Sequence, residues 1–212
     1  MQPRYTDTGV FIAFEGGEGG GKSTQAHLLA ERLRAQGHRV LLTHEPGATA
    51  VGQQLRAIVL GHDTGELAAR TEALLYAADK AEHVESVVLP ALADGQVVIT
   101  DRFVDSALAY QGAGRTLDVA EVEQVNRWAT ADLRPHLTVI LDVDPAVGLS
   151  RFDGADRIES EPLEFHQRVR DGFLALASRD PEHYVVVSAT ETPESVHAAV
   201  CAAVDARLGQ PR

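Results

Sequence analysis

The chain has 212 residues, a length typical of one domain or of two small ones. Hydrophobic residues make up 44% of the chain and charged residues 24%, which is the composition of a globular protein and excludes a disordered one. The 19 Lys and Arg residues against 31 Asp and Glu residues give a formal net charge of -12. This balance argues against a general nucleic-acid-binding protein, because such proteins usually carry a basic surface.

The single cysteine, Cys201, cannot form an internal disulfide, which favours a reducing compartment. The N-terminal residues contain no apolar stretch of the signal-peptide kind. No apolar run approaches the roughly 18 residues of a membrane span. The sequence therefore predicts a cytoplasmic protein that binds neither membranes nor nucleic acid.

Short apolar runs alternate with stretches of helical periodicity along the chain. In chain order, the predicted elements are a strand over Val10–Glu15, a helix over Lys22–Gln36, a strand over Arg39–Thr43, a helix over Val51–Leu60, a helical stretch over Leu67–Ala93 interrupted near Pro90, a strand over Val97–Thr100, a helix from Asp118 to about Ala131, a strand over Leu137–Val143, a short helix after Pro145, a helix over Pro162–Arg179, a strand over Tyr184–Val187 and a helix over Pro193–Leu208. Such alternation predicts an α/β fold with a parallel sheet covered on both faces. No repeat or long linker divides the chain, so residues 1–212 are predicted to form a single domain.

A glycine-rich motif follows the first predicted strand. Residues 16–23 read GGEGGGKS, which satisfies the pattern G-x-x-x-x-G-K-[ST] between a strand and a helix. Backbone N–H groups of such a loop surround phosphate oxygens, and the helix N-terminus adds its positive dipole end. The predicted ATP-binding residues are Gly16, Gly17, Glu18, Gly19, Gly20, Gly21, Lys22, Ser23 and Thr24. In such a site Lys22 reaches the β- and γ-phosphates, and Ser23 offers a hydroxyl to Mg²⁺.

The end of the third predicted strand helps to separate classes of nucleotide-binding protein. Asp101 ends this strand and is followed by Arg102, where ATPases that activate water usually carry a second carboxylate. An arginine there suits a second anion. The chain also lacks the guanine-reading N-K-x-D segment of GTPases. The sequence therefore favours phosphoryl transfer to a substrate, with Asp101 holding a water on Mg²⁺ or orienting Arg102.

Transfer between two phosphates requires fixed cations that neutralise their repulsion. Candidates on predicted loops and helix starts are Arg56, Arg102, Arg115, Arg151 and Arg157. Arg102 directly follows the C-terminal end of a strand, where open α/β sheets bind ligands. Arg151 and Arg157 flank a polar segment, and residues 151–160 are predicted to form a mobile lid.

Several motifs together resemble those of the thymidylate kinase family. They are FEGGEGGGKST at 14–24, HEPGAT at 44–49, TDRF at 100–103, DSALAYQGAGR at 105–115 and DRIESEPLEFHQRVR at 156–170. The resemblance runs from about Val10 to the last predicted helix. It implies a P-loop NTPase fold with a five-stranded parallel sheet. It further implies transfer of the γ-phosphoryl group of ATP to dTMP, with Mg²⁺, to form dTDP for dTTP synthesis, and a homodimer.

The resemblance also implies roles for single residues. By it, Glu18 contacts the sugar 3′-hydroxyl, Glu45, Arg56 and Arg102 lie near the acceptor phosphate, Tyr76 stacks on thymine, Tyr110 lies under the deoxyribose, Gln111 contacts the base, and Lys80, Ala107 and Arg115 complete the substrate-binding set. Gly20 stands where one subclass carries an arginine. The bacterial subclass without that arginine supplies the cation from the lid, so Arg157 is the first candidate for this role and Arg151 the second.

Four positions depart from the family pattern. Lys80 stands where relatives usually have an arginine that pairs with thymine O4, and lysine lacks the planar fork of arginine. Ala107 offers no acceptor where many relatives have Ser, Thr or Asn near the thymine N3–H. His44 replaces a common arginine, and Phe152 replaces a polar or basic lid residue. We therefore predict looser base selectivity than is usual, unless a water or Gln111 compensates.

Two alternatives remain open at the level of sequence. Another nucleoside or deoxynucleoside monophosphate kinase would share the loop and the arginines but read a different base. A nucleotide-binding switch would share the loop without transfer activity, although such a protein needs no second anion site. Binding of a monophosphate in addition to ATP distinguishes the switch from the kinases.

Overall fold

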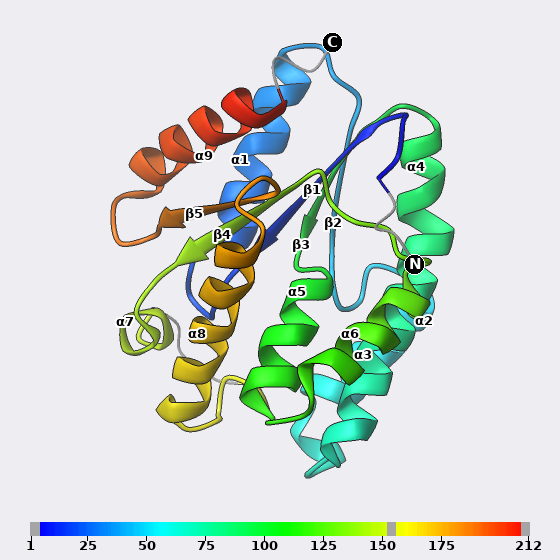
Figure 1. Cartoon of the computed structure of the whole chain (residues 1–212), viewed down its shortest axis with the longest axis vertical. Helices are drawn as coiled ribbons and strands as arrows, with labels where there is room; N and C mark the ends of the chain where they lie inside the picture. Colours follow the sequence, from blue (N-terminus) through cyan, green and yellow to red (C-terminus); the bar gives the residue numbers. More distant parts are fainter. Residues whose placement is uncertain (1–4, 152–155, 209–212) are drawn as a thin grey trace.

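The computed structural model of the chain describes residues 5–151 and 156–208. Parallel strands form a five-stranded sheet in the spatial order β2-β3-β1-β4-β5 (Figure 1). The strands are β1 (Val10–Glu15), β2 (Val40–His44), β3 (Val97–Asp101), β4 (Leu137–Asp142) and β5 (Tyr184–Ser188). β1 lies at the centre, and Ile12 pairs with Ile99 of β3 on one side and with Leu137 of β4 on the other.

Helices connect the strands. The α-helices are α1 (Lys22–Ala35), α2 (Ala50–Leu60), α3 (Ala69–His83), α4 (Leu89–Ala93), α5 (Val104–Ala107), α6 (Val119–Ala129), α7 (Pro145–Leu149), α8 (Leu163–Arg179) and α9 (Pro193–Leu208). A short 3-10 helix, η1, covers His62–Thr64, and two π-helical stretches, η2 (Val84–Val88) and η3 (Leu108–Gly114), continue α3 and α5. Among the described residues, no helix is long and apolar enough to cross a lipid bilayer.

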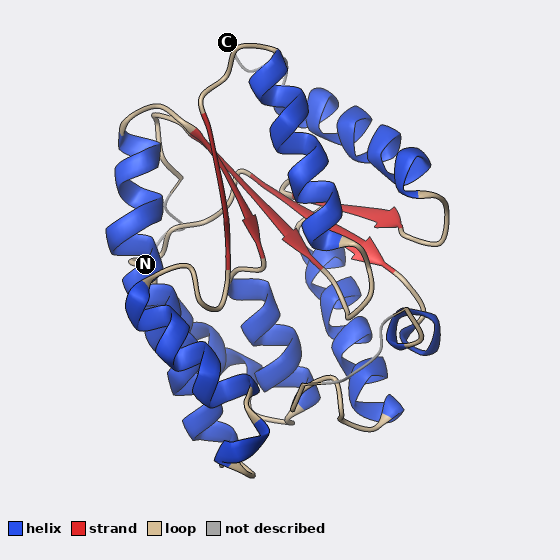
Figure 2. Ribbon diagram, turned by 180° about the vertical axis from the view of Figure 1, so that it is seen from behind, coloured by secondary structure: helices blue, strands red, loops and turns tan. Residues whose placement is uncertain are grey.

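The sheet is the middle layer of the molecule (Figure 2). α1 and α9 cover one face, and α4, α5 and α8 cover the other. Successive side chains of β1 point to opposite faces, because Ile12 and Phe14 join the core under α1 and α9, whereas Phe11 and Ala13 join the core on the other face. A strand buried on both faces requires the unbroken apolar run that this segment has.

The predicted strands are confirmed within two residues, and so are most of the helix ends. The predicted helix start at Asp118 is confirmed, since its carboxylate accepts hydrogen bonds from the N–H groups of Ala120 at 2.8 Å and Glu121 at 3.1 Å. The helical stretch before Pro90 differs in one detail. The α-helical pattern changes at η2, and Pro90 lies in the first turn of α4, where a missing N–H is tolerated.

Two elements were not predicted, namely the short helix η1 and the longer helical segment formed by α5 with η3. Nearly every residue of this segment is buried, so it has no polar face and no amphipathic period to reveal a helix. Gly114 also obscures the pattern, because glycine is a weak helix former. The glycine is required by packing, since a Cβ at Gly114 would lie 2.7 Å from Cε2 of Phe165 on α8. This buried segment carries Tyr110 and Gln111 beneath the carboxyl ends of the strands.

Candidate active site

The glycine-rich loop joins the end of β1 to the start of α1. Gly16 has a φ of +132°, and a Cβ there would lie 2.4 Å from the carbonyl oxygen of Leu141. Gly19 has a φ of +67°, and a Cβ there would lie 2.1 Å from the carbonyl oxygen of Gly148. Both positions therefore require glycine. Close packing against these carbonyl groups holds the loop in its curved shape before any ligand binds.

Lys22 lies over the loop. Its Nζ donates a hydrogen bond to the carbonyl oxygen of Gly17 at 2.6 Å, and the residue is only 7% exposed. Burial and the nearby Arg102 charge lower the pKa of Lys22, whereas Glu18 and Asp101 raise it. The ammonium group is thus held against the backbone of the glycine-rich loop.

Ser23 and Asp101, the two predicted Mg²⁺ residues, lie in contact beside the loop. The Ser23 hydroxyl donates a hydrogen bond to the Asp101 carboxylate at the end of β3. A first cavity, here called the loop cavity, is lined by Gly19, Gly21, Lys22, Ser23, Thr24 and Asp101, among others. The pair offers oxygen donors, which suit Mg²⁺.

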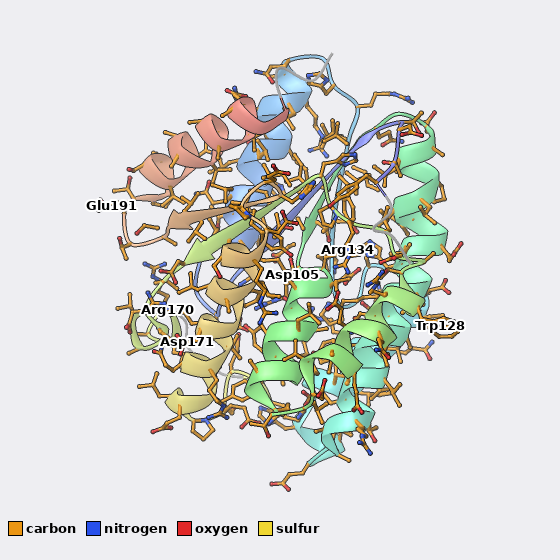
Figure 3. All side chains as sticks on the ribbon, viewed as in Figure 1. Asp105, Trp128, Arg134, Arg170, Asp171 and Glu191 are labelled. Carbon is orange, nitrogen blue, oxygen red and sulfur yellow. The ribbon has the colours of Figure 1, made fainter. Side chains whose placement is uncertain are left out.

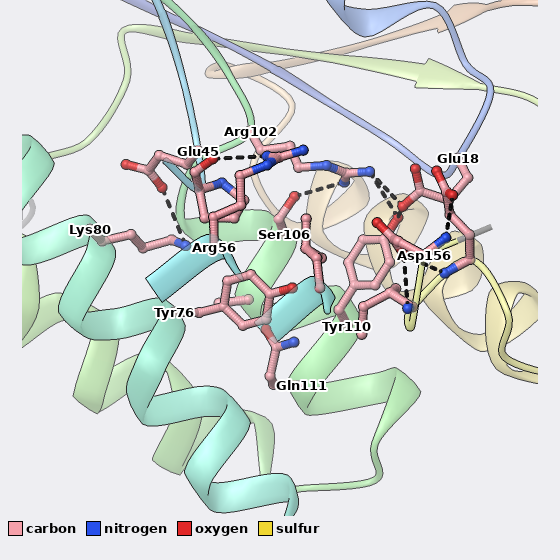
Figure 4. A pocket seen from close by; sticks show the side chains of 15 residues that line it. Glu18, Glu45, Arg56, Tyr76, Lys80, Arg102, Ser106, Tyr110, Gln111 and Asp156 are labelled. Atoms are coloured by element: carbon pink, nitrogen blue, oxygen red, sulfur yellow. Dashed lines mark hydrogen bonds and ion pairs between the residues drawn. The ribbon is translucent and has the colours of Figure 1, made fainter. Parts of the chain in front are cut away.

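Arg102 has the most contacts in the site (Figure 4). Its guanidinium group donates to Glu18 Oε1 at 2.6 Å, to the Tyr110 hydroxyl at 3.2 Å and to Ser106 Oγ at 3.1 Å. A further hydrogen bond reaches the carbonyl oxygen of Gly16 at 3.2 Å. Arg102 itself has a φ of 70°, the left-handed conformation that residues other than glycine rarely adopt.

Glu18 is held as a carboxylate. Burial raises its pKa, but the charges of Arg102 and Lys22 and the hydrogen bond from the Tyr110 hydroxyl, at 2.6 Å, lower it further, to about 2. Glu18 is therefore ionised at neutral pH and acts as a hydrogen-bond acceptor. This suits an acid predicted to contact a sugar hydroxyl.

A second cavity, here called the tyrosine cavity, lies next to the loop cavity. Its lining includes Glu18, Glu45, Arg56, Tyr76, Lys80, Arg102, Ser106, Ala107, Tyr110, Gln111 and Asp156 (Figure 4). It therefore brings together all of the predicted substrate-binding residues except Arg115. The two cavities share Glu18, Glu45, Arg56 and Arg102. The cationic side chains of Arg56 and Arg102 thus lie where the two cavities meet, as two approaching phosphates require.

Lys80 has a buried partner at the edge of the tyrosine cavity. Its Nζ lies 3.2 Å from Glu45 Oε2 and 5.7 Å from the centre of the Tyr76 ring. Glu45 also contacts His83 Nδ1 at 2.8 Å, and His83 Nε2 contacts the Thr43 hydroxyl at 2.7 Å. His83 was not predicted from the sequence, although it follows Tyr76 by seven residues, a spacing that keeps both on one face of a helix.

Arg115 and Arg157 do not line either cavity. Arg115 donates from Nε and Nη2 to Glu72 at 3.1 Å each, and it also pairs with Glu161. Arg157 donates from Nη2 to Glu72 Oε2 at 2.6 Å and from Nε to the carbonyl oxygen of Val59 at 2.8 Å. Both predicted phosphate-neutralising arginines are therefore paired with a buried carboxylate in this structure.

Arg151, the second candidate from the predicted lid, lies against the loop. Its guanidinium group donates to the carbonyl oxygen of Gly19 at 2.7 Å and to that of Ala189 at 2.9 Å. Residues 152–155 of the predicted lid, which include Phe152 and Gly154, lie outside the described residues.

Glu15 and Ser106 were missed by the sequence analysis. Glu15, at the end of β1, accepts hydrogen bonds from the N–H groups of Phe103 at 2.8 Å and Ser106 at 3.1 Å, and from the Ser106 hydroxyl at 2.6 Å. Burial and the nearby Asp105 raise the pKa of Glu15 to about 7. Ser106 Oγ in turn accepts a hydrogen bond from Arg102. Glu15 therefore holds the start of α5 and the Arg102 side chain in place together. The sequence pattern that could have identified Glu15 is an acidic residue at the end of an otherwise apolar strand.

Comparisons with known proteins agree with this geometry. A family model described as "Thymidylate kinase" matches residues 14–200. The chain is 55% identical over 186 residues to the thymidylate kinase of Clavibacter sepedonicus, across 86% of this chain and 88% of the relative. It is 53% identical over 199 residues to the thymidylate kinase of Synechococcus sp. (strain JA-2-3B'a(2-13)), across 94% of this chain and 96% of the relative. The crystal structure of thymidylate kinase from Ehrlichia chaffeensis has a TM-score of 0.79 and 33% identity, over 93% of this chain and 99% of that one. The chain belongs to the thymidylate kinase family and has the P-loop NTPase fold.

Proposed function

We propose that this enzyme transfers the γ-phosphoryl group of ATP to the phosphate of dTMP and so forms ADP and dTDP for dTTP synthesis. The observation that carries the proposal is the meeting of the loop cavity and the tyrosine cavity at Glu18, Glu45, Arg56 and Arg102. A triphosphate in one cavity and a monophosphate in the other would face each other there. An oxygen of the dTMP phosphate then bonds to the γ-phosphorus, while the bond from that phosphorus to the oxygen of departing ADP breaks.

We assign the donor side of the reaction to the loop and to Lys22. The backbone N–H groups of residues 16–21 surround the phosphates, Lys22 contacts the β- and γ-phosphates, and Thr24 completes the set. The curved loop supports this assignment, because Gly16 and Gly19 adopt conformations with positive φ that only glycine accommodates in the space available.

We propose that Ser23 and Asp101 serve a Mg²⁺ ion. The residues present fit this ion, since a hydroxyl and a carboxylate meet at the loop. Mg²⁺ commonly takes only one or two protein ligands, with substrate phosphates and waters supplying the rest. When bound, the ion neutralises charge on the phosphates.

The acceptor side is assigned to the tyrosine cavity. Arg56 and Arg102 bind the dTMP phosphate, with Glu45 positioning the surrounding groups. Tyr76 stacks on thymine, and Tyr110 and Glu18 contact the deoxyribose. Gln111, Lys80 and Ala107 surround the base. Arg115 contributes indirectly, through Glu72.

We place the chain in the subclass without an arginine in the loop, supported by Gly20 at that position. Residues 151–160 would then form the lid that supplies the cation. Replacing Arg157 with alanine is expected to lower kcat by about tenfold or more while KM for dTMP rises less, since the residue acts in the transition state. This role requires the guanidinium group to leave Glu72.

The matched comparison is Arg151→Ala, measured in the same steady-state assay. A pure rise in KM for Arg157→Ala would assign that residue to binding. A larger loss of kcat for Arg151→Ala would give the role to Arg151, whose contact with Gly19 already places it at the loop.

The experiment that tests the proposed function is an ADP-release assay with Mg·ATP and dTMP, dUMP, dCMP, dGMP, UMP or CMP, with a reaction lacking acceptor as control. We expect turnover with dTMP well above the rate without acceptor and above that with dCMP. Faster turnover with another monophosphate would favour a kinase of shifted base specificity. Equal ADP release with and without acceptor would favour an ATPase or switch.

We also propose a homodimer formed through α3 and α6. Leu74 of α3 is 59% exposed and Trp128 of α6 is 84% exposed and points outward (Figure 3). An apolar groove between these helices is lined by Ala73, Leu74, Leu117, Val122 and Val125, among others. A second copy would cover these side chains.

The cytoplasmic location predicted from Cys201 stays a prediction.

Light scattering is expected to give a mass about twice the 22.8 kDa of one chain. Leu74→Glu should shift the mass towards that of one chain, because it places a charge in the apolar groove. Leu163→Glu is the matched control, since Leu163 is 49% exposed on α8, outside the groove. A wild-type mass near 22.8 kDa would contradict the dimer.

A further inference from the structure

Glu72 is a fully buried carboxylate that joins three functional side chains. Oε1 accepts hydrogen bonds from Gln111 Nε2 at 3.0 Å and Arg115 Nε at 3.1 Å. Oε2 accepts from Arg115 Nη2 at 3.1 Å and Arg157 Nη2 at 2.6 Å. Burial raises the pKa of Glu72, but hydrogen bonds from Arg115, Gln111 and Arg157 lower it below its ordinary value. The group is therefore ionised at neutral pH and accepts hydrogen bonds only.

An ionised partner leaves the Gln111 amide with one orientation. If the amide turned over, its oxygen would face the Glu72 carboxylate, an acceptor against an acceptor in a buried place. The NH₂ group of Gln111 must therefore face Glu72. Gln111 lines the tyrosine cavity, and its remaining polar side-chain atom is Oε1.

We propose that Glu72 is a positioning residue for base recognition, which holds Gln111 so that Oε1 faces N3 of the substrate base. The proposal rests on the proposed function, since it takes the tyrosine cavity as the nucleotide site. Thymine and uracil carry a hydrogen on N3 that this oxygen accepts. Cytosine has a lone pair on N3, which the oxygen repels. Recognition of the N3–H thus depends on a residue that does not touch the base.

Glu72 also limits the loosened selectivity predicted from Lys80 and Ala107. Ala107 removes an acceptor near N3, and the oriented Gln111 supplies one in its place. Lys80 is paired with Glu45 and lacks the arginine fork for the O4 edge. The oriented Gln111 therefore preserves discrimination at N3, so dCMP does not gain on dTMP.

The test compares kcat/KM for dTMP, dUMP and dCMP in wild type and Glu72→Gln. A glutamine at this position can either donate or accept, so the Gln111 amide gains a second orientation. We expect the dTMP-to-dCMP ratio to fall by about tenfold or more, while the dTMP-to-dUMP ratio stays within about twofold. A merely structural role would lower all three values together and leave both ratios unchanged, which would overturn the proposal.

Glu161→Gln is the matched control. It removes a carboxylate partner of Arg115 at the same end of the site but has no contact with Gln111. We expect both ratios to match the wild type. A fall in the dTMP-to-dCMP ratio equal to that of Glu72→Gln would overturn the proposal, because the effect would then come from Arg115.

Gln111→Met keeps the test decisive if Glu72→Gln does not fold. Methionine has a similar length and offers no amide acceptor, so kcat/KM should fall for dTMP and dUMP but not for dCMP. An equal fall for all three would overturn the proposal. Failure of the proposed function has a different signature, because the wild type itself would then show no preference for dTMP over dCMP.

Discussion

Lys22→Ala is expected to lower kcat/KM for dTMP phosphorylation by about a thousandfold while the fold is kept. Nζ lies over the loop on the Gly17 carbonyl oxygen. In the proposed function it contacts the β- and γ-phosphates, whose negative charge it would neutralise during transfer. A fixed cation in a site that excludes water stabilises such charge strongly, and removal of one such group commonly costs about 10²- to 10³-fold.

The measurement is single-turnover transfer with saturating Mg·ATP, together with the thermal unfolding midpoint. The midpoint should change little, because burial already opposes the charged form of Lys22 and the side chain adds little to the core. Near-normal turnover in Lys22→Ala would remove the argument for the loop as the phosphate site. A large drop in the midpoint would show that the lysine stabilises the fold instead.

Arg102→Lys is expected to lower kcat/KM for dTMP by about a hundredfold although it keeps the positive charge. The guanidinium group reaches Glu18, Tyr110 and Ser106 at once, from a residue held in the left-handed conformation. Lysine is a point charge without the planar fork, so it cannot keep these contacts and also bind the acceptor phosphate. KM for ATP should change less, because the arginine stands at the junction and not on the loop.

Arg39→Lys is the matched control for this substitution. Arg39 pairs with Asp94 beyond the opposite ends of the strands and is largely exposed, so the same change there should leave kcat/KM within about twofold. Equal kinetics for Arg102→Lys and wild type would contradict the role of the planar guanidinium group. An effect confined to KM for ATP would indicate that Arg102 binds ATP and not the acceptor phosphate.

Local patterns sufficed for much of this molecule. The apolar run of β1, the glycine-rich loop and the start of α1 follow each other directly, so the loop and Lys22 were identified from adjacent residues. The helix start at Asp118 is equally local, because its cap contacts only the next three residues. The segment with α5 and η3 was missed for the opposite reason. Its burial on all sides depends on α6 and α8, and nothing in its own sequence marks a polar face.

The sequence by itself determined the parallel α/β fold, the glycine-rich loop and the set of residues around Tyr76 and Tyr110, since these follow from short-range patterns and from a resemblance carried by motifs. Only the tertiary structure decided how the arginines are used. Arg115 and Arg157 reach Glu72 across 43 and 85 positions of the chain, and such distant ion pairs leave no periodic signal in a sequence. The folded chain therefore shows Arg151 on the loop, Arg157 on a buried carboxylate, and Gln111 oriented by that same carboxylate.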